Sequence, residues 1–155
     1  MTHEALMVGE PEITEVTDSR QPRIRVSAFV ADTVARVSPR ATLPELADAL
    51  VAADVGALVV GDGDVVDAVV SERDIVRALA ARRDLTTTTA IDIATTKLIW
   101  CDADSTVAEV AMEMMDQYVR HVLVEEDGSL VGIVSARDLL GAYAATDIEV
   151  TPQEW

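Results

Sequence analysis

The feature that most constrains this chain is an internal repeat. Residues 68–80 read AVVSERDIVRALA and residues 132–144 read GIVSARDLLGAYA, so the second segment repeats the first after 64 positions. The match extends without a gap from about Ala35 to Ala80, and most positions keep their apolar or polar character. A match of this length in a segment of mixed composition indicates that one structural unit is used twice.

Each copy opens with the pattern of a capped amphipathic helix. TLPEL (42–46) and TVAEV (106–110) place a glutamate three residues after a threonine. This is the capping-box spacing, so Thr42 and Thr106 are predicted N-caps. Helical spacing then predicts one apolar face per copy, formed by Leu43, Leu46, Ala47 and Leu50 in the first and by Val107, Val110, Ala111, Met114 and Tyr118 in the second.

Two short apolar runs follow each helix and predict a β-hairpin. They cover residues 57–60 and 65–70 in the first copy, and residues 121–124 and 130–134 in the second, with Gly- and Asp-containing turns between them. Each hairpin runs into a predicted helix, over 72–83 or 136–144, and a short strand (35–37 or 98–101) precedes each copy. Since one such unit buries too little apolar surface to be stable alone, we expect an α/β (α+β) fold of two β-α-β-β-α repeats packed sheet to sheet around a common core.

Charge and cysteine content narrow the classes of function. Lys plus Arg is 12 and Asp plus Glu is 28, for a net charge of −16. This acidity argues against nucleic-acid binding and against docking on an anionic membrane. No apolar run reaches the ~20 residues of a membrane helix, and the first residues lack the pattern of a signal peptide. Cys101 is the single cysteine, so an internal disulfide is excluded and we expect a cytoplasmic protein.

The sequence offers no catalytic constellation. It contains no recognisable nucleophile–base pair, no cluster at metal-ligand spacing and no phosphate loop, so we expect a protein that is not an enzyme. Trp100, Cys101 and the methionines of residues 112–115 are interpreted as core or interface residues.

The tandem pattern resembles the cystathionine-β-synthase (CBS) domain pair, often called a Bateman module. The resemblance spans about residues 26–144 and depends on the Gly–apolar–apolar–Ser/Thr–x–x–Asp signature, which reads GIVSARD in the second copy and AVVSERD in the first, where Ala68 replaces Gly. It implies a small stand-alone member with an acidic flexible arm (1–23), a first CBS domain (24–81), a linker (82–97), a second CBS domain (98–145) and a C-terminal tail (146–155).

The resemblance also implies a ligand and its site. Two CBS units pack with pseudo-twofold symmetry and leave two clefts, in which many members bind adenine nucleotides or adenosyl compounds. By this resemblance Asp74 and Asp138 contact ribose hydroxyls, Ser71 and Ser135 lie near phosphate, and Arg120 and His121 reach phosphates, with Arg73 and Arg137 beside them. Gly56 and Ala57 take the places of Arg120 and His121 in the first copy and cannot do this, so we expect unequal clefts.

The same residues allow other interpretations. Ser-x-x-Asp before a helix is also a capping arrangement, and capping is compatible with ligand contact. Arg73, Arg77, Arg82 and Arg83 could pair with carboxylates such as Glu72 instead of meeting an anion. His121 could be a half-buried strand residue with no role in binding.

The function implied by the resemblance is regulatory. We expect a homodimeric module that requires no cofactor, binds an adenosyl small molecule and acts on an unknown effector protein in trans. The net charge favours AMP or S-adenosylmethionine over ATP as the ligand. The alternative is a ligand-free dimeric scaffold that associates through the apolar helix faces of residues 43–50 and 107–118.

Overall fold

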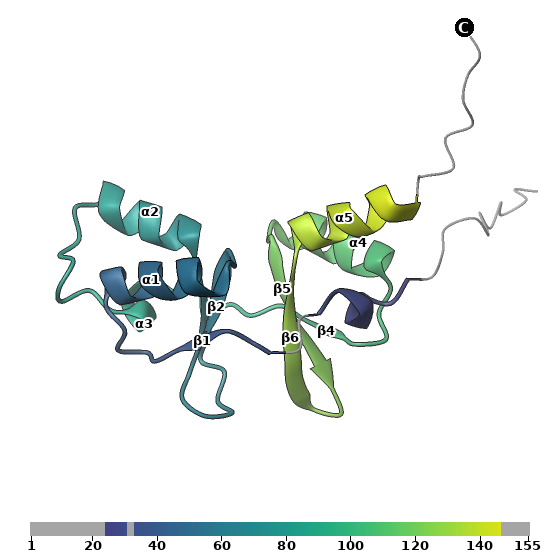
Figure 1. Cartoon of the computed structure of the whole chain (residues 1–155), viewed down its shortest axis with the longest axis horizontal. Coiled ribbons are helices and arrows are strands. Elements are labelled where there is room, and N and C mark those ends of the chain that lie inside the picture. Colours follow the sequence, from purple (N-terminus) through teal and green to yellow (C-terminus); the bar gives the residue numbers. More distant parts are fainter. Residues whose placement is uncertain (1–23, 31–32, 147–155) are drawn as a thin grey trace, which may run out of the picture.

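The computed structural model describes residues 24–30 and 33–146, which form two similar halves side by side (Figure 1). The predicted arm (1–23) and most of the predicted tail lie outside the described residues. No helix in the described part of the chain is both long and apolar enough to cross a membrane. The elements of the first half are β1 (Arg36–Val37), α1 (Leu43–Ala53), β2 (Ala57–Val60), β3 (Ala68–Ser71), α2 (Glu72–Ala80) and α3 (Ala90–Ile93).

The second half repeats this order and confirms the predicted β-α-β-β-α unit. Its elements are β4 (Trp100–Asp102), α4 (Val107–Gln117), β5 (His121–Glu126), β6 (Ser129–Ser135) and α5 (Ala136–Thr146), and a short 3-10 helix η1 (Val26–Phe29) precedes the first half. Each half has one three-stranded sheet, ordered β1-β2-β3 or β4-β5-β6. The two hairpins pair antiparallel, as predicted, and the leading strand of each half pairs in parallel with the first strand of its hairpin.

Some element ends differ from the prediction. Helix α2 ends at Ala80 rather than at residue 83, because Arg82 takes a left-handed conformation (φ 59°) and the chain turns there. The leading strands lie at 36–37 and 100–102 instead of 35–37 and 98–101. These short strands are placed by pairing with β2 and β5, which a local pattern does not reveal.

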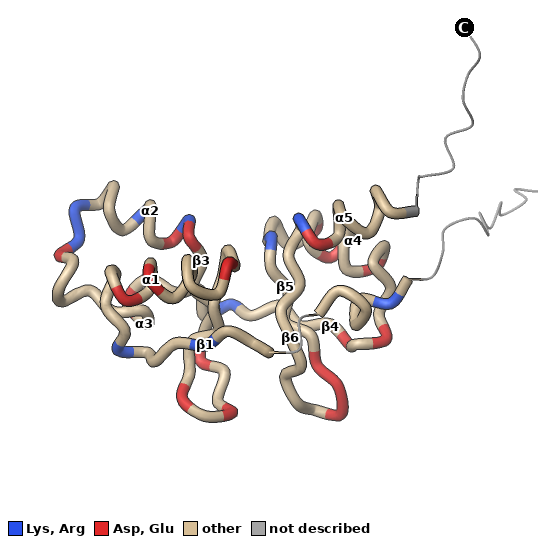
Figure 2. The backbone as a smooth tube through the Cα atoms, in the orientation of Figure 1, with Lys and Arg blue, Asp and Glu red and all other residues tan. Residues whose placement is uncertain are grey.

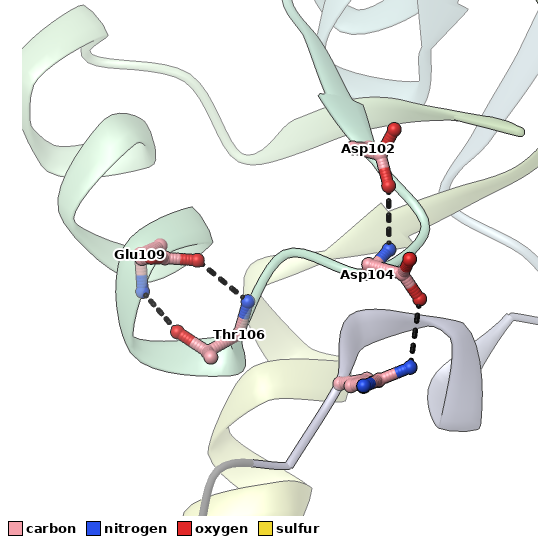
Figure 3. Close-up of polar contacts among 5 residues, drawn as sticks. Asp102, Asp104, Thr106 and Glu109 are labelled. Atoms are coloured by element: carbon pink, nitrogen blue, oxygen red, sulfur yellow. Dashed lines mark hydrogen bonds and ion pairs between the residues drawn. The ribbon is translucent and has the colours of Figure 1, made fainter.

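The capping boxes form as predicted. The Thr106 hydroxyl accepts a hydrogen bond from the Glu109 amide at 3.2 Å, and the Thr106 amide donates to Glu109 Oε2 at 2.8 Å (Figure 3). At the start of α1 the Thr42 amide likewise donates to Glu45 Oε2 at 2.8 Å. Both helices therefore begin where the Thr-x-x-Glu pattern places them.

The segment that leads into each half packs on the other half. Arg25, before η1, forms a β-bridge with Thr106 of the second half, and its guanidinium pairs with Asp104 at 2.9 Å (Figure 3). Val26 is fully buried in the hydrophobic core of the second half. Correspondingly, Thr89 bridges Thr42, and α3 packs in the core of the first half. The predicted domain boundaries assign each leading segment to the half that follows it in the sequence. In the structure, each leading segment packs on the other half.

The hydrophobic core is divided rather than common. Leu58 and Val60 of β2 point into a cluster under α1 and α2, and Val122 and Val124 of β5 point into a matching cluster under α4 and α5. Val59 and Leu123 alternate with these residues, are 0% and 2% exposed, and belong to neither cluster. Since successive strand side chains point to opposite faces and the two sheets lie next to each other (Figure 1), these two residues mark the sheet-to-sheet contact.

The replacement of the signature glycine by Ala68 has a packing explanation. A Cβ added to Gly132 would lie 1.9 Å from Cγ1 of Val30, so the second half needs glycine there to admit Val30. Ala94, which lies 64 positions after Val30, packs against the cluster that contains Ala68 in the first half. The second half therefore combines Gly132 with Val30, and the first half combines Ala68 with Ala94.

Candidate ligand site between the two halves

A cavity of about 210 Å³ is lined by residues of both halves. The first half contributes the end of β3 and the start of α2, from Ser71 to Asp74, and Arg77 one turn further along α2. The second half contributes the segment that enters β4 and the start of β5, including Arg120 and His121. The cavity therefore joins the signature of one copy to the basic pair of the other.

Five of the eight predicted ligand-binding residues line this cavity: Ser71, Arg73, Asp74, Arg120 and His121. The other three, Ser135, Arg137 and Asp138, lie at the matching start of α5 and are not among its lining residues. Ser135, Arg137 and Asp138 hold the positions equivalent to Ser71, Arg73 and Asp74, so the structure separates residues that the repeat made look alike. Ligand contact by any of the eight remains a prediction.

The start of α2 is fixed by its own hydrogen bonds. Asp74 Oδ2 accepts from the Ser71 amide at 2.8 Å and from the Ser71 hydroxyl at 3.0 Å, and the Asp74 amide donates to Ser71 Oγ at 3.4 Å. Ser135 and Asp138 form the equivalent box at α5. The capping interpretation of Ser-x-x-Asp is confirmed in both copies, and such a cap typically contributes about 1 kcal/mol to stability.

The opposite wall is held by α5 and β6. The Arg120 carbonyl accepts a hydrogen bond from the Ala136 amide at 2.8 Å, and His121 pairs with Ser135 in the β5–β6 ladder. The backbone on either side of these bonds is therefore fixed, while the Arg120 side chain stays exposed. The Arg120 backbone is therefore part of the fold, while its guanidinium lies at the cavity and is free to contact a ligand.

His121 is half-buried and lies among charges from both halves. Burial is the main cause that lowers its pKa from 6.5, and the neighbouring Arg120 cation lowers it further. The carboxylates of Asp138, Glu72 and Asp74 act in the opposite direction but do not reverse the shift. The imidazole is consequently neutral at pH 7 and can both donate and accept a hydrogen bond.

Gly56 provides room for this group of side chains. A Cβ at Gly56 would lie 3.4 Å from Glu72 Oε1 and 3.6 Å from His121 Nε2. Position 56 corresponds to Arg120 in the second copy. The absence of a side chain at Gly56 therefore leaves space around His121 as well as removing a cation from the first copy.

Lys97 was not predicted from the sequence as a site residue, and Arg77 was not distinguished from the arginines that follow it. Arg77 lines the cavity, but Arg82 and Arg83 lie beyond the end of α2 and do not. Lys97 is brought to the cavity because Thr95 forms paired backbone hydrogen bonds with Val69 of β3, at 2.9 and 3.0 Å. No local pattern around Lys97 indicates this bridge, which depends on the tertiary path of the linker.

The alternative interpretation, in which the arginine cluster forms ion pairs with carboxylates, is not supported for Arg73 and Arg77, although the Arg83 cation contributes, after the hydrogen bonds from Thr89, to a lowered pKa of Asp92. Among residues 24–30 and 33–146, the ion pair found is that of Arg25 with Asp104. Glu72 therefore forms no ion pair with Arg73 or Arg77, and neither arginine has an ionic partner within this part of the chain. Their charges remain available to a bound anion.

The other residues singled out in the sequence are not among those that line this cavity. Trp100 is 38% exposed on β4, and Cys101 packs against the second core with a pKa raised to about 11, mainly by burial. Met114 is a core residue, whereas Met112 and Met115 are exposed. In the described residues, no group of three or more His, Cys, Asp or Glu side chains is arranged to hold a metal ion.

Comparison with known proteins identifies the family of this chain. The family model of the CBS domain matches residues 26–81 and again residues 90–145. The chain therefore belongs to the CBS domain family and is a tandem CBS pair. A comparison with curated protein sequences finds no match.

Solved structures share this fold over most of the chain. A protein with CBS domains from Burkholderia ambifaria is 25% identical, with a TM-score of 0.75 over 82% of this chain and 98% of its own. A CBS domain protein from Pyrobaculum aerophilum, solved in complex with AMP, is 35% identical, with a TM-score of 0.67 over 79% of this chain and 99% of its own. The CBS domain pair of protein MJ0100, in complex with 5′-methylthioadenosine and S-adenosyl-L-methionine, is 22% identical, with a TM-score of 0.69 over 77% and 98%. At that identity, the last similarity shows the fold alone.

Proposed function

We propose that this CBS pair is a cytoplasmic regulatory module that binds an adenine nucleotide or adenosyl compound between its halves and acts on a partner protein in trans. The observation that carries the proposal is the cavity that joins Ser71 and Asp74 of one copy to Arg120 and His121 of the other. The AMP complex of the similar protein from Pyrobaculum aerophilum supports the choice of ligand class.

The hydrogen bonds at α2 are compatible with a ribose contact. The capping box uses Oδ2 of Asp74, so the second carboxylate oxygen is not engaged by any described residue. A short carboxylate at this position can accept hydrogen bonds from two vicinal hydroxyls. Arg120 and His121, on the opposite wall, supply a cation and a neutral donor for the other end of the ligand.

Regulation would follow from the position of the cavity. A ligand that contacts both halves stabilises the arrangement in which those contacts are made, and a partner that senses this arrangement responds to the ligand. The ligand can change the populations of the two arrangements only by as much as its affinity differs between them.

The proposal is tested with Asp74→Asn and its matched control Asp138→Asn. Asparagine keeps one oxygen for the cap in both variants, but only Asp74 lines the cavity. We expect AMP to raise the melting temperature of the wild type and of Asp138→Asn, and to raise that of Asp74→Asn much less. Calorimetric titration gives the affinities. An unchanged melting temperature with AMP, ATP, methylthioadenosine and S-adenosylmethionine would exclude the proposal.

A second candidate function is a dimeric scaffold. On the helix faces first considered for it, Leu43, Leu46, Leu50, Val107, Val110 and Met114 are buried in the chain's own cores, whereas Tyr118 is 96% exposed. Other apolar side chains on α1, α4 and α5 are exposed, including Val51 (81%), Met115 (69%) and Leu140 (69%). Under this proposal Met115→Glu with Leu140→Glu lowers the mass measured by sedimentation equilibrium, and Asp74→Asn leaves it unchanged.

A further inference from the structure

The walls of the cavity concentrate positive charge in an acidic protein. Four of the chain's 12 Lys and Arg residues line it, namely Arg73, Arg77, Lys97 and Arg120, against the two carboxylates of Glu72 and Asp74. All four cationic side chains are exposed, so their charged groups remain hydrated and accessible. The local balance of charge is therefore opposite to that of the whole chain.

The acidic residues that dominate the net charge lie elsewhere. Many gather on the two hairpin turns, at the lower edge in Figure 2, where Asp62, Asp64, Glu126 and Asp127 are exposed. At physiological ionic strength the interaction between exposed charges decays over about 8 Å. The potential inside the cavity is consequently set by its own lining residues and by Asp138, whose carboxylate acts on the lining His121, and the net charge is a poor guide to the ligand.

The fold does not need three of these four cations. Arg77, Lys97 and Arg120 correspond to Gly141, Thr33 and Gly56 in the other copy, and both copies form the same elements. Neither the helix starts nor the sheets therefore require a positive charge at these positions. None of the lining cations forms an ion pair within the described residues, so a role in internal salt bridging is not seen either.

We infer that Arg77 and Lys97 determine the ligand specificity of this site and select phosphate-bearing adenine nucleotides over uncharged or cationic adenosyl compounds. The inference rests on the proposed function, since it assumes that an adenosine moiety occupies the cavity. A phosphate monoester carries a charge of about −1.5 to −2 near pH 7. This charge complements the four cations on the walls, which outnumber Glu72, Asp74 and the nearby Asp138, whereas a sulfonium group would be repelled by these cations.

The test compares ligands that share adenosine and differ in charge. AMP, neutral 5′-methylthioadenosine and S-adenosylmethionine are titrated calorimetrically into the full chain. We expect AMP to bind at least tenfold more tightly than methylthioadenosine, and S-adenosylmethionine to bind most weakly. Raising the salt concentration should weaken AMP binding and leave methylthioadenosine binding nearly unchanged.

The variants are Arg77→Gln, Lys97→Gln and their combination, with Arg83→Gln as the control for loss of a positive charge. Arg83 is exposed, lies beyond the end of α2 and does not line the cavity. Charge-assisted contacts make each lining variant about tenfold weaker for AMP, which is about 1.4 kcal/mol. Binding of methylthioadenosine should be unaffected in all variants, and melting temperatures without ligand show whether each variant is folded.

The outcomes separate the two proposals. If methylthioadenosine or S-adenosylmethionine binds as tightly as AMP, or if the double variant keeps its AMP affinity, the specificity inference is wrong while the proposed function stands. If AMP affinity falls equally in Arg83→Gln, the effect belongs to net charge and the inference is again wrong. If no adenosyl compound binds the wild type, both the function and the inference fail.

Discussion

The Val30 contact predicts that Gly132→Ala is strongly destabilising. The new Cβ would lie 1.9 Å from Cγ1 of Val30, 3.1 Å from its Cβ and 3.3 Å from Cγ2. Rotation of the valine about χ1 moves the γ carbons but not Cβ, so the backbone of one segment has to shift. Overpacking of this kind typically costs about 1–3 kcal/mol, which lowers the melting temperature by roughly 3–10 °C in a chain of this size.

A double-mutant cycle identifies the cause. Val30→Ala alone removes two half-buried methyl groups and should cost about 1 kcal/mol. Val30→Ala with Gly132→Ala recreates the alanine pair of the first half and should recover most of the loss caused by Gly132→Ala, measured by urea denaturation. Gly141→Ala is the control, because a Cβ there meets nothing within 4 Å and helix propensity makes the change stabilising. Additive losses in the double variant would refute the packing explanation.

Three further predictions concern single side chains. Burial and Arg120 lower the pKa of His121 below 6.5, so the unfolded chain binds the proton more readily than the folded chain. The free energy of unfolding should therefore fall as the pH drops below about 6.5. In acid denaturation, His121→Gln should remove this part of the pH dependence. The Cys101 thiol, with its pKa raised from 9.0 to about 11, should react with iodoacetamide near pH 8 about a hundredfold more slowly in the native chain than in denaturant, and equal rates would contradict its burial. Thr106→Ala removes a capping hydroxyl and should cost about 1 kcal/mol, whereas Arg25→Gln removes an exposed ion pair and should cost less than about 0.5 kcal/mol; a larger loss for Arg25→Gln in thermal unfolding would reverse our ranking.

The fold was largely predictable because its strongest signals are local. The Thr-x-x-Glu and Ser-x-x-Asp patterns determine where four helices begin, and all four starts were placed correctly. Each hairpin has its turn within a few residues, so its pairing needs no distant information. Because the two copies align without a gap at an offset of 64, the elements predicted for one copy could be assigned to the equivalent residues of the other.

The parts that could not be predicted depend on contacts between distant segments. Val30 and Gly132 are far apart in sequence, and the substitution at Ala68 looked like a departure from the signature until the packing explained it. Lys97 reaches the cavity only through the bridge between Thr95 and Val69. Two copies with the same pattern also gave no indication of which Ser–Asp pair would face Arg120.

The exchange of leading segments bears on how such a chain arose. A single ancestral copy would carry one leading segment, and that segment would complete the core of a neighbour rather than its own. Such a copy is therefore expected to fold as a domain-swapped homodimer. Fusion of two genes would join the partners covalently and free the halves to diverge, as the glycine–valine and alanine–alanine packings and the one-sided distribution of cations in this chain illustrate.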